Sequence, residues 1–204
     1  MNLKILPEHI HDLMGRGATA LASLDTSELE RLCDEARALP FHDVEVVTKT
    51  GVVQNFRSCD TLPEDGALRS LMQAAEVVID DQLHRKYQVI QTPLRFNEGV
   101  VQVYREAAIS QKYSISPHRD HKECINVIAV FVLEGEASFC VCKERSGADP
   151  EVISSRPGDL ILMRGYGFLG LPRPFHFVDN VKQGTRISFG LRHLMKREVM
   201  SNRR

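Results

Sequence analysis

The sequence contains no tryptophan, and only 6% of its 204 residues are aromatic. Proteins that flip bases or bind single strands use aromatic side chains for stacking, so this composition gives little support for a nucleic-acid groove. Neither sign of charge dominates, because 26 lysines and arginines stand against 27 acidic residues, for a net charge of −1. The chain therefore has no overall attraction for phosphate backbones. Nucleic acid is an allowed partner but not the favoured one.

Long apolar runs are also missing. None approaches the ~20 residues that a membrane-spanning helix requires. The N-terminal residues Met1–Pro7 soon give way to Glu8 and His9, so they lack the apolar stretch of a secretory signal. We expect a cytoplasmic protein with no membrane partner.

The cysteines are irregular in number and spacing. They are Cys33, Cys59, Cys124, Cys140 and Cys142, and none forms a C-x-x-C pair. An odd count argues against a disulfide framework, and the spacing argues against a tetrahedral zinc site. Cys140 and Cys142 share one face of a predicted strand, and we interpret them as small buried apolar residues.

The N-terminal part of the chain has helical patterns and one change of period. Pro7–Leu24 has a helical rhythm weakened by two glycines, and residues 25–28 predict the start of a second helix that ends at Pro40. Residues 42–56 alternate like a β-hairpin with a glycine turn, and this hairpin is predicted either to extend the sheet edge or to cover an active-site mouth. Pro63–Leu83 carries an apolar stripe of period 3.6, which predicts a long helix packed on the main sheet.

One domain spanning residues 1–204 is predicted, because 43% hydrophobic and 26% charged residues at this length are typical of a single globular unit. Residues 1–88 form a helical and hairpin support, and residues 89–195 form the core. The core region consists of short predicted strands separated by turns, at about 100–104, 125–133, 137–141, 151–154, 160–163, 173–178 and 185–191. This spacing predicts a mainly β protein with flanking N-terminal helices (α+β), with a double-stranded β-helix of the jelly-roll, cupin-like kind.

The residues with the clearest chemistry lie in this core. His118 and Asp120 form an H-x-D motif at a strand end, and residues two apart on a strand point to the same face, so both can bind one ion. His176, flanked by apolar strand-like residues, is the best candidate for a third ligand. Two histidines and one carboxylate on one face of an octahedral ion are typical of non-haem Fe(II) oxygenases. Arg186 follows at an even offset of ten residues, and its guanidinium suits a carboxylate of a dicarboxylic acid.

This order, H-x-D followed by a distal histidine and then an arginine, resembles the Fe(II)/2-oxoglutarate-dependent dioxygenases. The resemblance covers about the C-terminal half of the chain. It implies Fe(II) bound by His118, Asp120 and His176, with 2-oxoglutarate and O₂ as cosubstrates and succinate and CO₂ as products. Arg186 would bind 2-oxoglutarate.

A second arginine, Arg192, and Tyr104 on an earlier strand are similar to the two arginines and tyrosine that bind 2-oxoglutarate in the AlkB-type nucleic-acid demethylases. Gln102 stands where the AlkB pattern has asparagine. The matching tyrosine and arginine imply that Tyr104 and Arg192 also bind 2-oxoglutarate. Arg192 is alternatively a ligand of a substrate carboxylate or the partner of a surface acid.

Three functions follow from these patterns. The favoured one is hydroxylation of a C–H bond of a small-molecule or amino-acid-like substrate, because the charge is near neutral and the chain is short. AlkB-type demethylation of alkylated nucleic acid is the alternative, and a non-catalytic cupin-like binding protein is the third. His121 is a rival imidazole, which we interpret as lying outside the ligand set. The patterns predict no oligomeric state.

Overall fold

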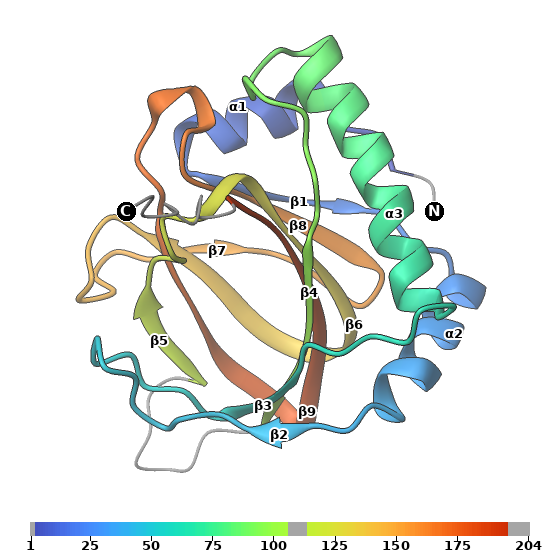
Figure 1. Ribbon diagram of the computed structural model, residues 1–204. Coiled ribbons are helices and arrows are strands. Elements are labelled where there is room, and N and C mark those ends of the chain that lie inside the picture. The colour runs from blue at the N-terminus through green and yellow to red at the C-terminus, as the bar shows by residue number, and fades with distance from the viewer. Residues whose placement is uncertain (1–2, 106–113, 196–204) are drawn as a thin grey trace, which may run out of the picture.

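The computed structural model describes residues 3–105 and 114–195 (Figure 1). Three α-helices precede most of the sheet: α1 (Pro7–Gly15), α2 (Thr26–Arg37) and α3 (Ala67–Asp80), which continues into a π-helical turn (Asp81–Lys86). Figure 1 shows α2 and α3 along one side of the sheet and α1 at its upper end. α3 buries the predicted stripe through Leu68, Leu71, Ala75 and Ile79, which confirms its role as a support.

The strands form one antiparallel sheet that rolls up on itself. They are β1 (Ala18–Ala22), β2 (His42–Asp43), β3 (Phe56–Cys59), β4 (Glu98–Arg105), β5 (Ile115–His118), β6 (Cys124–Cys142), β7 (Glu151–Ile153), β8 (Asp159–Arg164) and β9 (Phe175–Leu194). The order is β1-β8-β6-β9-β4-β3-β2, with β5 paired to β9 and β7 paired to β6. The predicted mainly β architecture with N-terminal helices is therefore confirmed.

The two longest strands differ from the prediction of short separate strands. The segments 125–133 and 137–141 belong to the single strand β6, and 173–178 and 185–191 fall largely within β9. β6 stays paired with β9 through several register shifts, and Gly135 has φ +75° at the bend. A Cβ at Gly135 would collide with the backbone carbonyl of Thr185, so only glycine allows the ribbon to bend without losing its pairing.

Alternation along these strands separates two faces. On β9, Ile187, Phe189 and Leu191 join the large core cluster against the helices. The residues that alternate with these, including Arg186 and Arg192, therefore face the inside of the roll. A second cluster, which contains Phe56, Tyr104, Ile128, Phe139, Ile161 and Val178, lines this interior. The sheet thus has one face for helix packing and one face for a site.

The first predicted helix is shorter than expected. α1 ends at Gly15, and residues 18–22 form β1, which pairs with β8. Gly17 has φ +96°, and a Cβ there would lie 2.9 Å from Arg164 Nη2. This backbone conformation ends the helix and turns the chain into the sheet, so the prediction of helix through Leu24 is wrong.

The segment 42–56 is only partly a regular hairpin. β2 has two residues, which pair with β3 at Arg57 and Ser58, and one isolated bridge joins Val47 to Val53. The predicted turn is present, because Gly51 N donates to Thr48 O over 2.8 Å. Most of this segment is an irregular loop that leaves the sheet edge.

The start of α2 follows the predicted pattern. The Asp25 carboxylate accepts a hydrogen bond from Glu28 N over 2.9 Å, and the Glu28 side chain returns to Asp25 N over 3.2 Å. This reciprocal cap satisfies two backbone donors that a helix start leaves unpaired.

Replacing Asp25 with alanine is expected to lower the melting temperature by about 2–4 °C, because one cap is lost in a domain of this size. Thermal unfolding followed by circular dichroism measures it. Asp25→Asn keeps the acceptor and should stay near wild type. Equal losses in both variants would assign the effect to charge and contradict the capping argument.

The five cysteines are all buried and free of disulfides, and the predicted burial of Cys140 and Cys142 is confirmed. Among the described residues, no helix is long and apolar enough to cross a membrane.

Candidate metal centre

Strand pairing brings the three predicted metal ligands together. β5 ends at His118, whose Cα pairs directly with that of His176 on β9. Asp120 follows after one intervening residue, and its Oδ2 lies 3.4 Å from His176 Nε2. One ligand atom from each of the three side chains lies within 4.8 Å of the others. Sequence positions 58 apart thus meet because β5 docks on the start of β9.

The protonation of these groups suits a divalent metal ion. His118 Nδ1 lies 2.9 Å from the carbonyl oxygen of Ser116, and donation of the Nδ1 proton to this oxygen leaves the lone pair of Nε2 free to bind a metal ion. Burial, with a further contribution from His118, lowers the pKa of His176 to about 3, so this imidazole is neutral at physiological pH. Burial alone would raise the pKa of Asp120, but the net effect lowers this pKa, and the positive charge of Arg192 is the main cause. Two imidazoles and one carboxylate form a ligand set that fits Fe(II).

Arg186 lies deeper in the roll, opposite Tyr104 on β4. It is 1% exposed, and its Nη2 has no hydrogen-bond partner among the described residues. Burial lowers the pKa of this guanidinium, and no carboxylate of the residues that the structure describes forms an ion pair with it. A buried cation with an unsatisfied donor is costly unless an anion compensates it. The carboxylate of a dicarboxylic acid such as 2-oxoglutarate fits this position.

Tyr104 is buried beside Arg186, with its ring centroid 5.6 Å from the guanidinium carbon. Its hydroxyl donates to Gln102 Oε1 over 3.0 Å, and burial raises its pKa, so the hydroxyl stays protonated as a donor. The predicted role of Tyr104 in cosubstrate binding is compatible with this place and stays a prediction.

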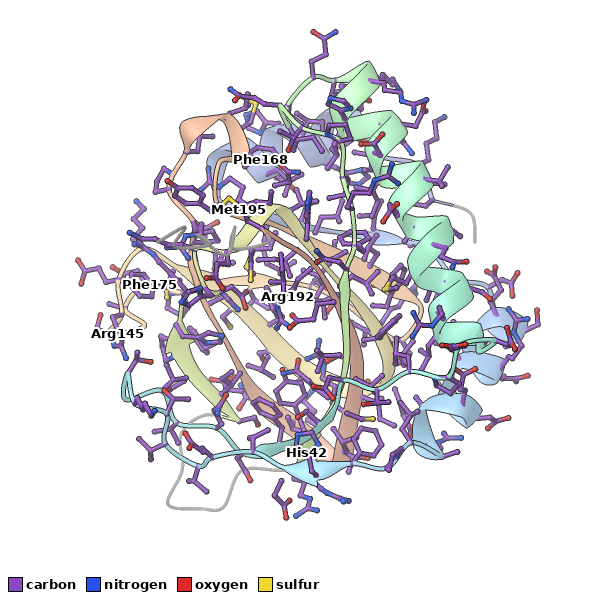
Figure 2. All side chains as sticks on the ribbon, viewed as in Figure 1. His42, Arg145, Phe168, Phe175, Arg192 and Met195 are labelled. Carbon is purple, nitrogen blue, oxygen red and sulfur yellow. The ribbon has the colours of Figure 1, made fainter. Side chains whose placement is uncertain are left out.

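Arg192 pairs with acidic side chains, which is one of the alternatives that the sequence left open, although no pattern identified which acids these are. Its Nη1 donates to Glu98 Oε2 over 2.8 Å, and its Nε lies 3.4 Å from Asp120 Oδ1. Burial would lower the pKa of Arg192, but these two carboxylates outweigh it and raise the pKa. Figure 2 shows Arg192 within the roll. In this conformation Arg192 orients the candidate metal ligand Asp120, and its predicted contact with 2-oxoglutarate stays a prediction.

A cavity of about 270 Å³ joins these residues. The three candidate metal ligands His118, Asp120 and His176 (the triad) line it, and so do Tyr104, Arg186 and Arg192. The other lining residues come from the 42–56 loop, from the sheet and from the segment after β5: Thr48, Thr50, Val52, Gln54, Phe56, Gln102, Ile115, Arg119, His121, Val130, Phe139, Met163 and Val178. A larger cavity of about 490 Å³ lies beside α3 and contains no member of the triad. The chemistry therefore belongs to the smaller one.

The loop residues at the mouth had only a weak signal in the sequence. Val53 N donates to Ser116 Oγ over 2.9 Å, and Ser116 N donates back to Val53 O over 3.0 Å. These bonds attach the 42–56 loop to the strand that carries His118, so the loop contributes to the cavity rather than only to the sheet edge. His121, the imidazole that was interpreted as lying outside the ligand set, is exposed, and its Nδ1 lies 3.4 Å from Glu123 Oε2.

No family model matches the chain, and no curated protein does. Solved structures do match across almost its whole length. A 2OG-Fe(II) oxygenase family oxidoreductase from Burkholderia pseudomallei is 13% identical, with a TM-score of 0.66, over 94% of this chain and 90% of that one. The chain has the fold of the 2-oxoglutarate/Fe(II) oxygenases. The predicted jelly-roll fold is thereby confirmed.

Two further structures with this oxygenase fold hold different molecules. A prolyl hydroxylase from Trichoplax adhaerens, in complex with a peptide fragment, is 12% identical with a TM-score of 0.68 over 91% of this chain and 87% of that one. HygX from Streptomyces hygroscopicus, with nickel, 2-oxoglutarate and hygromycin B bound, is 16% identical with a TM-score of 0.58 over 92% of this chain and 86% of the HygX chain. The oxygenase fold therefore accommodates both peptide and small-molecule ligands.

Proposed function

We propose that this protein is an Fe(II)- and 2-oxoglutarate-dependent oxygenase that hydroxylates a C–H bond of a small-molecule or amino-acid-like substrate and releases succinate and CO₂. One observation carries this proposal. The His118–Asp120–His176 cluster lines the same cavity as the buried Arg186, whose Nη2 has no hydrogen-bond partner among the described residues. A metal site next to an anion site is what binding of Fe(II) and 2-oxoglutarate requires.

Several residues of the cavity have a direct role in this activity. His118, Asp120 and His176 bind the metal from one side, and Arg192 holds the Asp120 carboxylate in place. Arg186 binds the carboxylate of 2-oxoglutarate that lies away from the metal. Apolar side chains, including Phe139 and Met163, exclude water around the reacting atoms. When bound, Fe(II) supplies the redox chemistry that couples oxidation of 2-oxoglutarate by O₂ to hydroxylation of the substrate.

A small substrate fits the cavity better than a nucleic acid does. A volume of about 270 Å³ lies just below the range of ~300–1,000 Å³ typical of ligand pockets, and 2-oxoglutarate takes part of it. HygX provides a structural precedent for a small organic molecule in this fold. Arg192 is engaged by two acids, which weakens its likeness to the AlkB arginine pair.

Succinate formation by the Fe(II)-loaded protein is expected to rise with a pool of small metabolites and to ignore methylated oligonucleotides. The small-molecule response should change little between about 50 and 200 mM salt, because no release of condensed counterions is involved. Mass spectrometry of succinate measures the response to the metabolite pool and the response to the oligonucleotides. Salt-sensitive stimulation by methylated single strands would contradict the small-molecule proposal and support the demethylase instead.

A further inference from the structure

One basic side chain of the cavity has no role so far. Arg119 lies between the two ligands of the H-x-D motif, is exposed, and lines the cavity. Its guanidinium carbon lies 4.1 Å from the centroid of the Phe175 ring, and no ion pair involves it among the described residues. Stacking on an aromatic face restrains the planar fork without neutralising it. Arg119 is thus a pre-oriented positive group next to the metal site.

The other charges of the cavity compensate one another. Asp120 is the only acid among the described residues that line it. Arg192 contacts both Asp120 and Glu98, and His121 lies beside Glu123. With a divalent ion and dianionic 2-oxoglutarate bound, their charges and those of Asp120, Glu98, Arg186 and Arg192 sum to zero.

The charge of Arg119 is therefore left over at the cavity mouth. A positive group beside low-dielectric walls concentrates anions and strengthens a charge-assisted hydrogen bond. The facing loop supplies Thr48, Thr50 and Gln54, which donate or accept hydrogen bonds and carry no charge. Among the described residues that line the cavity, Arg119 thus has the one charge that no other group compensates, and the loop residues Thr48, Thr50 and Gln54 are polar and neutral.

We propose that the primary substrate is a small molecule with a single carboxylate, which Arg119 binds as an ion pair. This proposal rests on the proposed oxygenase function and adds the charge of its substrate. The carboxylate sits on the stacked guanidinium at the mouth, and the rest of the molecule points toward the metal site.

The test uses the full chain loaded with Fe(II) and 2-oxoglutarate. A pool of monocarboxylic acids, made of 2-hydroxy acids and N-acetylamino acids, is compared with a pool of their primary amides, in which a neutral group of similar size replaces the charged carboxylate. Succinate formation is measured with each pool. Stimulation by the acids and not by the amides is expected.

Arg119→Gln should reduce the stimulation by the acid pool about tenfold or more, because it removes a charged hydrogen-bond donor. Arg119→Lys should be intermediate, since it keeps the charge and loses the fork. Arg156→Gln is the matched control, because Arg156 is exposed on the turn before β8 and does not line the cavity. It should respond to the acids like the wild type.

Equal stimulation by acids and amides, undiminished stimulation in Arg119→Gln, or no response to either pool would overturn the proposal. Binding of 2-oxoglutarate to the wild-type Fe(II) protein is measured first, without any pool. Failure at that step would refute the proposed function itself, whereas 2-oxoglutarate binding followed by a wrong pool response refutes only the assignment of the carboxylate.

Discussion

Replacing Asp120 with alanine is expected to abolish Fe(II)-dependent turnover and to weaken metal binding by more than about 100-fold. Mutation of a residue that only orients a metal ligand typically lowers metal affinity about 10–100-fold, so loss of the only carboxylate among the three candidate ligands should lower it further. The substitution also removes one of the two acids that hold Arg192, leaving Glu98. Titration with Co(II) followed by visible absorption measures metal affinity independently of turnover.

Asp65→Ala is a suitable control, because Asp65 is exposed in the loop before α3 and does not line the cavity that contains the triad. It should bind metal like the wild type. Metal affinity of Asp120→Ala within about tenfold of wild type would mean that the carboxylate is not a ligand, and the proposed metal centre would fail.

Replacing Arg186 with lysine is expected to weaken 2-oxoglutarate binding by about 1–3 kcal/mol, while metal affinity stays nearly unchanged. Lysine keeps the charge but cannot form the two parallel hydrogen bonds that a guanidinium offers a carboxylate. Anaerobic titration of the Fe(II) protein with 2-oxoglutarate, followed by its charge-transfer band, gives the dissociation constant.

Arg186→Met separates binding from folding. It removes a buried cation whose Nη2 has no hydrogen-bond partner in the described part of the chain. The ligand-free protein should therefore unfold at a temperature no lower than the wild type while losing 2-oxoglutarate binding. An unchanged dissociation constant in Arg186→Lys would instead move the anchor elsewhere in the cavity, with Arg192 as the next candidate.

The parts of the site that were predictable from sequence depend on local periodicity. His118 and Asp120 are two residues apart, and Arg186 shares a strand with His176 at an even offset, so one strand pairing brings them together. The engagement of Arg192 by Glu98 was not predictable. Glu98 lies opposite Arg192 only because β4 pairs with β9 in this register, and no local pattern encodes that register.

The same limit applies to the fold. Alternating apolar residues predicted the jelly-roll class, whereas β1 was hidden in a segment with helical rhythm. Its strand conformation depends on β8, which follows it by more than 130 residues. Tertiary pairing overrides weak local preference in such segments. The contribution of Thr48 and Gln54 to the cavity likewise depends on bonds to Ser116, far along the chain.

The position of β9 has a consequence for biosynthesis. β9 lies between β6 and β4 in the sheet, yet it is translated after every other described strand. Until it emerges from the ribosome, β4 and β6 each present an unpaired edge, and the nascent chain lacks His176, Arg186 and Arg192. Unpaired edges promote aggregation, and late long-range pairing slows folding. We therefore expect this protein to depend on chaperones until β9 has paired, and metal loading to follow that pairing.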